Sequence, residues 1–411
     1  MRLGVLLFMV TSYFMLSAQC NGGRYEQKVF SQVKVTKNIV SHAAINASGR
    51  MQNIMMDVYE PQNDTASLRP LIVFQHGGAY WTGTKDYQSQ IAMGNEFAKR
   101  GYVLASATYR QEPSFISLIF QDLMLKAVGR GVQDTKQELR YFYNSARDSA
   151  NPFRIDTNRI FLCGASAGAF NVLHSVYLDQ QDSLPAQWLT WLNQIGGVFD
   201  TYDFKDFGSS LAGIVNINGA LGNQSFLDNE HLPFLSVHNI WDPEIPFNRG
   251  RPYNIASLMY VDGSNILHQK AQQLQIYNPF YIIPDNGHTS YSSDFFGTVV
   301  QPFFDSTVWY MNKFFTHQLG CDLATPVIYD KIKQAKIYPN PTTDFFNIDA
   351  AFSDAKSIQI FDLYGKLLIT LPFKTGYYTT GDLHLNNGIY ILSLIDDKGE
   401  ILSTGKLTIT N

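Results

Sequence analysis

The chain has 411 residues, which is longer than one ordinary domain and predicts a large α/β domain joined to a smaller module. Its formal net charge is −4 with acidic and basic residues dispersed, which argues against a nucleic-acid-binding protein. No group of His, Cys and Asp residues has metal-ligand spacing. We therefore expect no metal, no cofactor and no nucleic-acid partner.

Residues 1–19 have the pattern of a secretory signal peptide. A positive charge at Arg2 precedes an almost wholly apolar stretch over residues 3–16, and small residues suited to cleavage follow. The stretch is too short for a membrane span, so we expect no stable span. Export implies an oxidising compartment in which Cys20 and Cys321 could form a disulfide, although a free Cys20 is an equally simple interpretation.

Residues 20–320 predict a mostly parallel sheet with helices on both faces. Two antiparallel opening strands are expected at 32–36 and 53–59, after which apolar strands alternate with helical segments. The later strands are expected at 71–75, 102–107, 159–163, 213–217, 233–237 and 280–283, and the helices at 91–100, 120–148 and 304–317. In such sheets the chemistry lies on loops after the carboxyl ends of the strands.

The segment Gly164-Ala-Ser-Ala-Gly168 lies between a predicted strand and a helix with one apolar face. Glycines two residues before and after Ser166 allow a sharp strand-to-helix turn that exposes the hydroxyl. A serine hydroxyl is a poor nucleophile unless a base lies within hydrogen-bonding distance. The pattern predicts Ser166 as the nucleophile.

The base and its orienting carboxylate are expected on later loops. His288 follows the last predicted strand in a turn-rich segment, and His238 at the end of a strand is a minor competitor. Asp242 follows the preceding strand, with Glu244 as the alternative. The predicted triad is therefore Ser166, Asp242 and His288, in the chain order of an α/β-hydrolase.

Backbone N–H groups must stabilise the oxyanion that forms when serine attacks an ester carbonyl. Small residues that directly follow a strand would let the main chain approach the substrate. The residues predicted to form this oxyanion hole are Gly77, Gly78, Ala79 and Ala167. We expect His76 to brace the loop by hydrogen bonding.

Aromatic side chains flank these loops. We predict substrate-binding roles for Tyr80 and Trp81, beside the oxyanion loop, and for Trp241, beside the acid. Residues 188–192 could form an amphipathic cap helix or belong to the core. The substrate is expected to be a small-molecule or glycan ester.

Several segments together resemble the carboxylesterase and hormone-sensitive-lipase-like branch of the α/β-hydrolase superfamily, including BD-FAE-like proteins. The resemblance covers residues 30–318 and rests on His76-Gly-Gly-Ala-Tyr-Trp81, Tyr109-Arg110, Gln133-Asp134, Gly164-Ala-Ser-Ala-Gly168, Asp242-Pro-Glu-Ile-Pro246 and Gly287-His288. It implies metal-free hydrolysis of carboxylic esters through an acyl-enzyme, with Ser166 as nucleophile, His288 as base and Asp242 as its orienter.

The sequence departs from this family pattern at two positions, Ala79 and Asn239, where glycine is usual. Ala79 retains an N–H, so the oxyanion hole is expected to persist. Asn239 puts the turn that carries Asp242 in question. Arg110 and Asp134 match family positions that we interpret as a buried structural ion pair.

Residues 321–334 form a predicted linker, and residues 335–411 a predicted small antiparallel β-sandwich. Its strands are expected at 357–361, 366–370, 388–393 and 406–410. Tyr338-Pro-Asn-Pro341, Phe361-Asp-Leu-Tyr-Gly-Lys366, Leu385-Asn-Asn-Gly-Ile-Tyr390 and Gly405-Lys-Leu-Thr-Ile409 resemble the C-terminal sorting domain of the type IX secretion system of Bacteroidetes. The resemblance implies the type IX machinery as a partner and delivery outside the outer membrane. A carbohydrate-binding or adhesive module is the competing interpretation.

The sequence thus predicts a secreted serine carboxylic ester hydrolase. Removal of acetyl or feruloyl groups from polysaccharides is one hypothesis for its substrate, and a broad short-chain carboxylesterase is the more general interpretation. Two alternatives stay open. One is a serine peptidase of the prolyl-oligopeptidase type, which shares the hydrolase domain, and the other is a non-catalytic recognition protein on the same fold.

Overall fold

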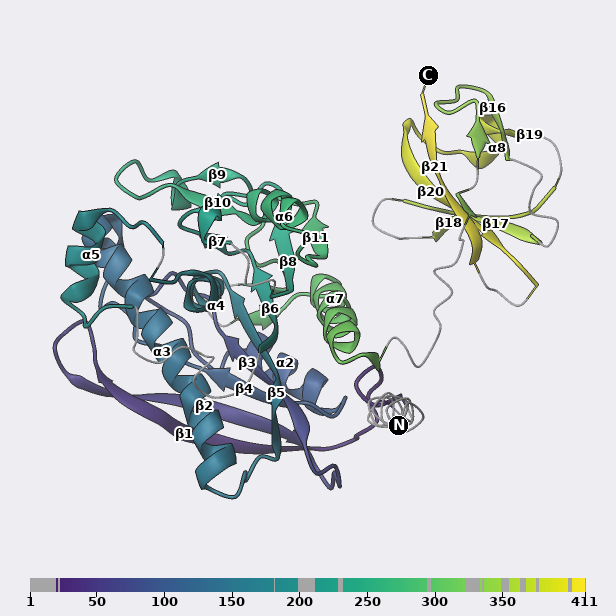
Figure 1. The fold of residues 1–411 in the computed structure, drawn as a ribbon. Helices are drawn as coiled ribbons and strands as arrows, with labels where there is room; N and C mark the ends of the chain where they lie inside the picture. The colour runs from purple at the N-terminus through teal and green to yellow at the C-terminus, as the bar shows by residue number, and fades with distance from the viewer. Residues whose placement is uncertain are drawn as a thin grey trace, which may run out of the picture. The chain divides into compact units, whose positions relative to one another are not determined.

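The computed structural model describes residues 20, 23–180, 182–198, 211–227, 232–293, 297–321, 333–334, 336–348, 355–362, 367–374, 377–397 and 401–410. The chain divides into two compact units, Met1–Ala324 and Thr325–Asn411 (Figure 1). The boundary falls within the linker expected at 321–334. The signal peptide predicted at residues 1–19 lies outside the described residues.

An eight-stranded sheet forms the centre of the first unit. Its order is β1-β2-β4-β3-β5-β6-β8-β11; β2 runs antiparallel to β1 and β4, and the other neighbours are parallel. The strands are β1 (Val33–Ile45), β2 (Met51–Pro61), β3 (Arg69–Gln75), β4 (Val103–Ala107), β5 (Ile155–Ala165), β6 (Leu211–Ile217), β8 (Phe234–Asn239) and β11 (Phe280–Ile283). This arrangement confirms the predicted α/β-hydrolase fold, including its antiparallel opening strands.

Helices cover both faces of this sheet because its central strands are apolar on both sides (Figure 1). In β3, Leu71 and Val73 pack in one core cluster and Ile72 and Phe74 in the other. The first cluster includes residues of α3 (Gln121–Asp148), α4 (Ala167–Tyr177) and α6 (Ser264–Gln273), and the second includes residues of α2 (Gln88–Ala98) and α7 (Phe303–Gln318). The helices expected at 91–100, 120–148 and 304–317 are confirmed.

The chain reverses its direction of travel across the sheet between β3 and β5. From β3 it passes through α2 to β4 on one side, and it then returns through α3 to β5 on the other side of β3. The loops after β3 and β5 therefore lie next to each other at the carboxyl edge. Open parallel sheets place their ligand sites at such a reversal.

Several short elements were not expected from the sequence. Among them are the three-stranded sheet β7-β10-β9 (Ala220–Leu221, Val261–Gly263, Arg249–Gly250) and the pair β12 and β13 (Ser292–Ser293, Thr298–Val299). The helix considered for residues 188–192 is present as α5 (Ala186–Asn193), which packs against α3. Strands of two or three residues are too short to show a period of two. Helix α6 was missed because only Leu267 and Ala271 supply buried apolar side chains in a run rich in Gln.

The second unit consists of two sheets that share one core. The larger has the order β14-β21-β20-β17-β18 (Lys333–Gln334, Ile401–Ile409, Gly388–Ile395, Ser357–Phe361, Leu367–Pro372), and the smaller the order β15-β16-β19 (Ile337–Tyr338, Phe345–Ile348, Tyr377–Thr379), followed by α8 (Thr380–Leu383). Phe346 and Tyr378 of the smaller sheet belong to the same buried cluster as Ile358 and Leu392 of the larger. The four predicted strands are present. They pair antiparallel, as expected, whereas β14, which lies in the predicted linker, pairs with β21 in parallel.

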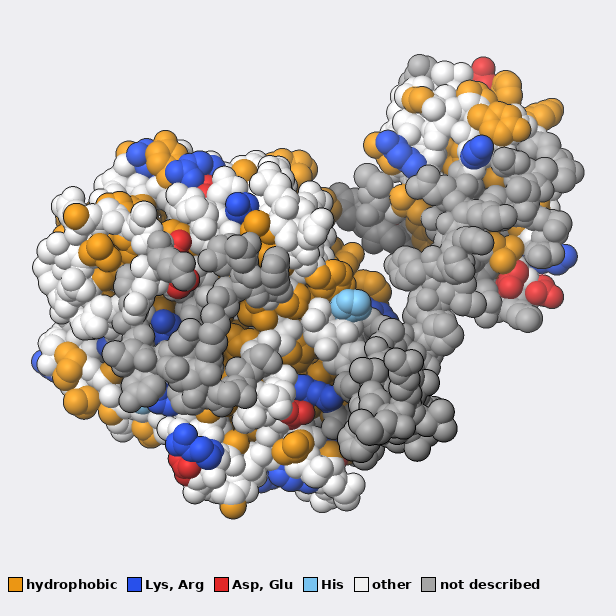
Figure 2. All heavy atoms as spheres, in the orientation of Figure 1, with side chains coloured by type: hydrophobic (Ala, Val, Ile, Leu, Met, Phe, Trp, Pro, Cys, Tyr) orange, Lys and Arg blue, Asp and Glu red, His pale blue; other side chains and the backbone are white. Residues whose placement is uncertain are grey.

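Charged side chains on the face shown in Figure 2 are scattered in both signs and do not form one broad basic surface. Within the described ranges, no helix combines the length and apolar character required to cross a membrane. The same ranges contain no cluster of three or more His, Cys, Asp or Glu residues suited to a metal ion.

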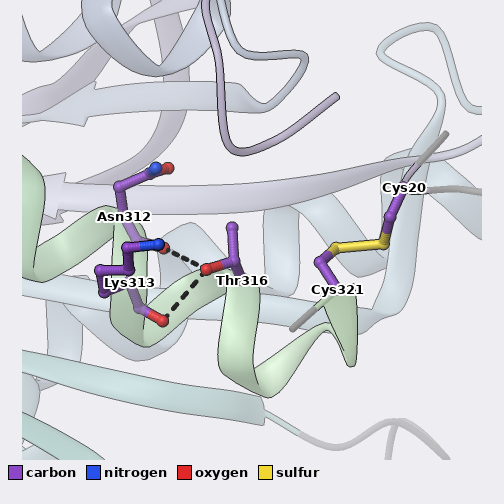
Figure 3. The surroundings of a disulfide bond; sticks show 5 residues. All are labelled: Cys20, Asn312, Lys313, Thr316 and Cys321. Carbon is purple, nitrogen blue, oxygen red and sulfur yellow. Dashed lines mark hydrogen bonds between the residues drawn. A yellow bond between two sulfur atoms is a disulfide. The ribbon is translucent and has the colours of Figure 1, made fainter. Parts of the chain in front are cut away.

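A disulfide joins Cys20 to Cys321, the pairing that the sequence left open (Figure 3). Cys321 lies just beyond α7, whose last turns include Thr316; the Thr316 hydroxyl donates to the carbonyl oxygens of Asn312 and Lys313. The remaining cysteine, Cys163, is buried on β5 and free. The two cysteines are separated by 301 residues in the sequence, so the bond links the two ends of the described part of the first unit.

Replacing both bonded cysteines (Cys20→Ser with Cys321→Ser) should lower the free energy of unfolding of the first unit by about 2–4 kcal/mol, because the unfolded chain regains the freedom that the bond removes. Tryptophan fluorescence during urea unfolding measures this unit alone, since all five tryptophans lie in it. A reducing agent should destabilise the wild type and leave the double variant unchanged. Equal stability of oxidised and reduced wild type would contradict the assignment.

Candidate active site

Ser166 occupies a strained turn between β5 and α4. Its backbone has φ 51° and ψ −118°, a conformation that residues other than glycine rarely adopt, and its N–H donates to Ile217 O at 2.8 Å. A side chain at Gly164 would collide with the backbone of Gly168, and one at Gly168 with the backbone oxygens of Gln75 and His76. The two glycines are therefore required by close backbone packing.

Ser166, His288 and Asp242 form one continuous hydrogen-bonded chain. His288 Nε2 lies 2.8 Å from Ser166 Oγ, and His288 Nδ1 lies 2.7 Å from Asp242 Oδ2. An ionised carboxylate only accepts, so Nδ1 carries the imidazole proton and the lone pair of Nε2 faces the serine hydroxyl. The three residues follow β5, β11 and β8, so the carboxyl edge of the sheet brings them together.

The two competing residues occupy other positions. Glu244 Oε2 lies 3.6 Å from His288 Nε2, whereas Asp242 contacts Nδ1. His238 is fully buried, with Nδ1 2.7 Å from Ser264 Oγ and Nε2 3.4 Å from Asp242 Oδ2. Asp242 therefore contacts His288, and His238 in turn contacts Asp242.

Asp242 is held as a buried carboxylate. Burial alone would raise its pKa, but hydrogen bonds from His238, His288 and Asn218 outweigh this effect and hold the pKa well below its usual range. Its other oxygen, Oδ1, accepts from the N–H groups of Glu244 at 2.8 Å and Ile245 at 3.0 Å. The carboxylate is therefore ionised at neutral pH and fixed in orientation.

Asn239, at a position where the family pattern led us to expect glycine, connects the loop of Asp242 to the loop of His288. Its side-chain amide donates to Asp285 and, at 2.6 Å, to Ser290 Oγ. Its oxygen accepts from Asn218 Nδ2 at 2.9 Å, and the same Asn218 amide donates to Asp242. The substitution therefore does not disrupt the turn before Asp242; it adds bonds that tie this turn to the His288 loop.

The loop after β3 lies directly against the serine. A Cβ placed on Gly77 would lie 3.2 Å from Ser166 Cβ, and one on Gly78, which has φ 123°, would collide with the carbonyl of Thr82. Ala79 also has positive φ, at 49°. No backbone carbonyl of the described residues accepts from the N–H groups of Gly78 and Ala79.

Ala167 is the first residue of α4, so its N–H lies in the first helical turn, where there is no intrahelical acceptor. The loop after β3 and the start of α4 thus both carry N–H groups beside Ser166. These N–H groups belong to the residues that the sequence predicted for the oxyanion hole.

His76 braces this loop, as expected. It is fully buried, and burial lowers its pKa to about 4, so the ring is neutral at pH 7. Its Nδ1 donates to Gly77 O at 2.6 Å, and its ring stacks on Tyr109 with centroids 4.6 Å apart. The hydroxyl of Tyr109 in turn donates to His76 O at 3.0 Å.

Two cavities meet at Ser166. The first is an apolar pocket of about 80 Å³. Its lining residues include Met124 and Val128 of α3, Phe170 of α4, Trp188 and Leu192 of α5, Leu258 of the segment 252–261, and also Phe226 and Ile245. The second, a more polar cleft of about 370 Å³, is lined by Gly77, Gly78, Trp81, Thr82, Tyr87, Ser89, Gln90, Phe115, Glu244, His288, Thr289, Tyr291 and Ser292, among others. Ala79, Ser166 and Tyr253 line both.

The predicted substrate-binding residues do not all lie in the same cavity. Trp81 lines the cleft and Tyr80 lines the pocket, whereas Trp241 is 64% exposed and lies in neither. Residues 188–192 lie on α5, and Trp188 and Leu192 face the pocket. Tyr253, which separates pocket from cleft, had been noted only as one of several nearby aromatic residues.

Comparison with known proteins agrees with this geometry. Residues 56–213 match the BD-FAE family, and residues 336–410 match the secretion system C-terminal sorting domain. The first unit contains a BD-FAE domain with the α/β-hydrolase fold. The second contains a sorting domain of the type IX secretion system.

Individual relatives are distant. The isoprenylcysteine alpha-carbonyl methylesterase ICME of Arabidopsis thaliana is 28% identical over 145 residues, which cover 35% of this chain and 30% of that protein. A truncated carbohydrate esterase from gut microbiota is 15% identical, with 72% of this chain and 98% of that chain covered and a TM-score of 0.45. Butyrate-bound esterase Est2 of Thermogutta terrifontis is also 15% identical, with 72% and 96% covered and a TM-score of 0.47.

The ion pair expected between Arg110 and Asp134 of the BD-FAE domain is present. Arg110 Nε and one terminal nitrogen lie 2.9 Å from Asp134 Oδ1, and the Arg110 N–H donates to Oδ2 at 2.7 Å. His42 Nε2 lies 3.0 Å from the same carboxylate. The Asp134 carboxylate is fully buried, so the pair is structural.

A buried polar chain beneath the BD-FAE site was not foreseen. The hydroxyl of Tyr80 donates to Asn171 Oδ1 at 2.7 Å and to Ala167 O at 3.1 Å, which fastens the loop after β3 to α4. Asn171 donates to Gln75 Oε1 at 2.9 Å, and Gln75 Nε2 donates to Glu138 Oε2 at 2.8 Å. Burial raises the pKa of Glu138 well above its usual range, so the chain ends on a carboxylic acid.

Glu138 gives the stability of the BD-FAE domain a specific pH dependence. The pKa of Glu138 is raised in the folded state, so the native chain keeps a proton that the unfolded chain loses above about pH 4.3. The stability that depends on this proton is complete below that pH and is lost as the pH rises from there through the raised pKa of the folded state. Glu138→Gln mimics the protonated form. The variant should match the wild type near pH 4 and become increasingly more stable than it towards pH 8, as measured by urea unfolding.

Glu26→Gln, at a partly exposed position, is the control for the loss of one carboxylate from the chain. A constant difference for Glu138→Gln across the same range would show that Glu138 is not held protonated.

Proposed function

We propose that this protein is a serine carboxylic ester hydrolase that acts through an acyl-enzyme formed on Ser166. The observation that carries the proposal is the continuous chain from Ser166 Oγ through both nitrogens of His288 to the buried carboxylate of Asp242. It combines a hydroxyl, a base whose Nε2 lone pair faces that hydroxyl, and an ionised carboxylate that orients the base.

The reaction follows from these positions. His288 Nε2 takes the proton of Ser166 as Oγ bonds to the ester carbonyl carbon, and the imidazolium that forms is stabilised by Asp242. The oxyanion accepts from the N–H groups of Gly78, Ala79 and Ala167, while Gly77 permits the close approach. His288 then protonates the departing alcohol oxygen as the C–O bond breaks. A water, deprotonated by His288, hydrolyses the acyl-enzyme and restores Ser166.

We assign the two halves of the ester to the two cavities. His288 must protonate the leaving oxygen, and it lines the cleft, so the alcohol lies in the cleft. The acyl group then occupies the apolar pocket on the other side of Ser166. The pocket is the narrower of the two, which favours a small acyl group such as acetyl over feruloyl.

A polysaccharide is the alcohol that we propose. The cleft offers the indole of Trp81, 39% exposed, for stacking on a sugar ring, and the partly exposed hydroxyl of Ser292 for one of its hydroxyls. The larger free volume of the cleft agrees with an alcohol bulkier than the acyl group.

Ser166→Ala should reduce kcat for 4-nitrophenyl acetate by about 10⁴-fold or more, because the nucleophile is removed and only binding and oxyanion stabilisation persist. Ser175→Ala on the same helix α4, where the hydroxyl donates to Val172 O of that helix at 2.9 Å, is the control and should retain activity. Equal rates for wild type and Ser166→Ala would refute the triad. Hydrolysis of aminoacyl-nitroanilides without hydrolysis of esters would instead favour a peptidase.

We further propose that residues 1–19 direct export to the periplasm and that the type IX machinery then carries the protein across the outer membrane, where the sorting domain is removed and the enzyme is released or attached to the surface. Two observations support the route: the match of residues 336–410 to the sorting domain and the compact, separate core of the second unit.

Deleting residues 335–411 should leave the enzyme in the periplasm with its esterase activity intact, because the deletion removes no residue of the pocket, the cleft or the triad. Cell fractionation with activity assays on each fraction measures this. Normal delivery of the truncated protein to the cell surface would contradict the sorting role.

A further inference from the structure

Glu244 stands at the reacting edge of the cleft. Its Oε2 lies 3.6 Å from His288 Nε2, the atom that protonates the leaving oxygen in the proposed reaction. The Glu244 side chain is 37% exposed and lines the cleft, so a bound alcohol meets it directly.

Three hydrogen bonds hold Glu244 in place, one at its carboxylate and two at its backbone. The hydroxyl of Tyr253 donates to Glu244 Oε2 at 2.8 Å, and the N–H of Tyr253 donates to Glu244 O at 2.6 Å. The N–H of Glu244 donates to Asp242 Oδ1 at 2.8 Å, which couples its position to the triad. Tyr253 itself has positive φ, at 53°, and its ring packs edge-on against Phe115 at 5.8 Å.

The cleft contains no opposite charge to neutralise Glu244. Among the described residues that line it, none is Lys or Arg, and the remaining polar groups are hydroxyls, amides and the His288 ring. The cleft therefore has a negative potential that an alcohol must enter before its ester oxygen reaches His288.

We propose that Glu244 is a specificity-determining residue that selects esters by the charge of their alcohol, favouring cationic over neutral and neutral over anionic alcohols. The inference rests on the proposed esterase function. For polysaccharides it means that an acetylated neutral or amino sugar is accepted, whereas a carboxylate-bearing sugar near the ester is repelled. Like charges disfavour binding and opposite charges favour it, to a degree reduced by solvent at this exposure.

Three acetate esters of comparable size test the proposal: acetylcholine, its neutral isostere 3,3-dimethylbutyl acetate, and 2-acetoxyethanesulfonate. For each, kcat/KM of the wild type is divided by that of Glu244→Gln, which cancels the intrinsic reactivity of the ester. The ratios should fall in the order cation, neutral, anion, with about tenfold between the extremes at low ionic strength, and should converge in 1 M salt.

Equal ratios for the three esters would overturn the inference, because a merely structural role of Glu244 would change all three alike. Tyr253→Phe is the matched control, since it removes the hydrogen bond to Glu244 and keeps the charge. It should preserve the order, because the carboxylate and its charge remain in the cleft. Failure of the wild type to hydrolyse the neutral ester would instead refute the esterase function itself.

Discussion

The site depends on the close approach of the loops after β3 and β5, where the chain reverses its direction of travel across the sheet. β3 and β5 are neighbours, and the loops that follow them touch: Gly77 lies against Ser166, and Gly168 lies against the carbonyls at the end of β3. Side chains at either glycine position would push the loops apart. The strained φ of Ser166 persists because strands on both sides and helix α4 determine the backbone around it. N–H groups from two distant segments can therefore converge beside one hydroxyl.

The polar groups around this contact divide into charged and neutral sets, and burial enforces the division. Asp242 remains ionised because several donors converge on it, whereas Glu138 lacks a cationic partner among the groups that shift its pKa and remains protonated. His76 is neutral for the same reason as Glu138, namely burial. The ionised Asp242 accepts a hydrogen bond from His288, and the neutral groups hold the loops. A second ionised carboxylate in place of Glu138 would add an unpaired charge to the core.

The sequence predicted the strands and the triad because both leave local signals. Long apolar runs mark the strands, and the glycines around Ser166 mark the turn; strand order then selected His288 and Asp242 from the loops. The chain from Glu138 to Tyr80 left no such signal, since its four polar residues lie on separate elements without periodicity. Adjacency to Asp242 did not determine where Trp241 points, because successive residues of a turn diverge. The place of Tyr253 between the two cavities could not be predicted from the sequence, because it depends on a loop conformation with positive φ.

The disulfide and the hydrophobic cores divide the chain at the same place as its two proposed roles, ester hydrolysis and sorting. The disulfide joins Cys20 to Cys321, and both bonded residues lie before the boundary at Ala324. The two core clusters on either side of the large sheet draw only on residues of the first unit, and the core of the second unit draws only on residues 337–409. Cleavage beyond Ala324 would therefore leave the first unit with both ends covalently joined and its core complete. An enzyme that loses its sorting domain after transport needs this independence, because no partner domain is then present to stabilise it.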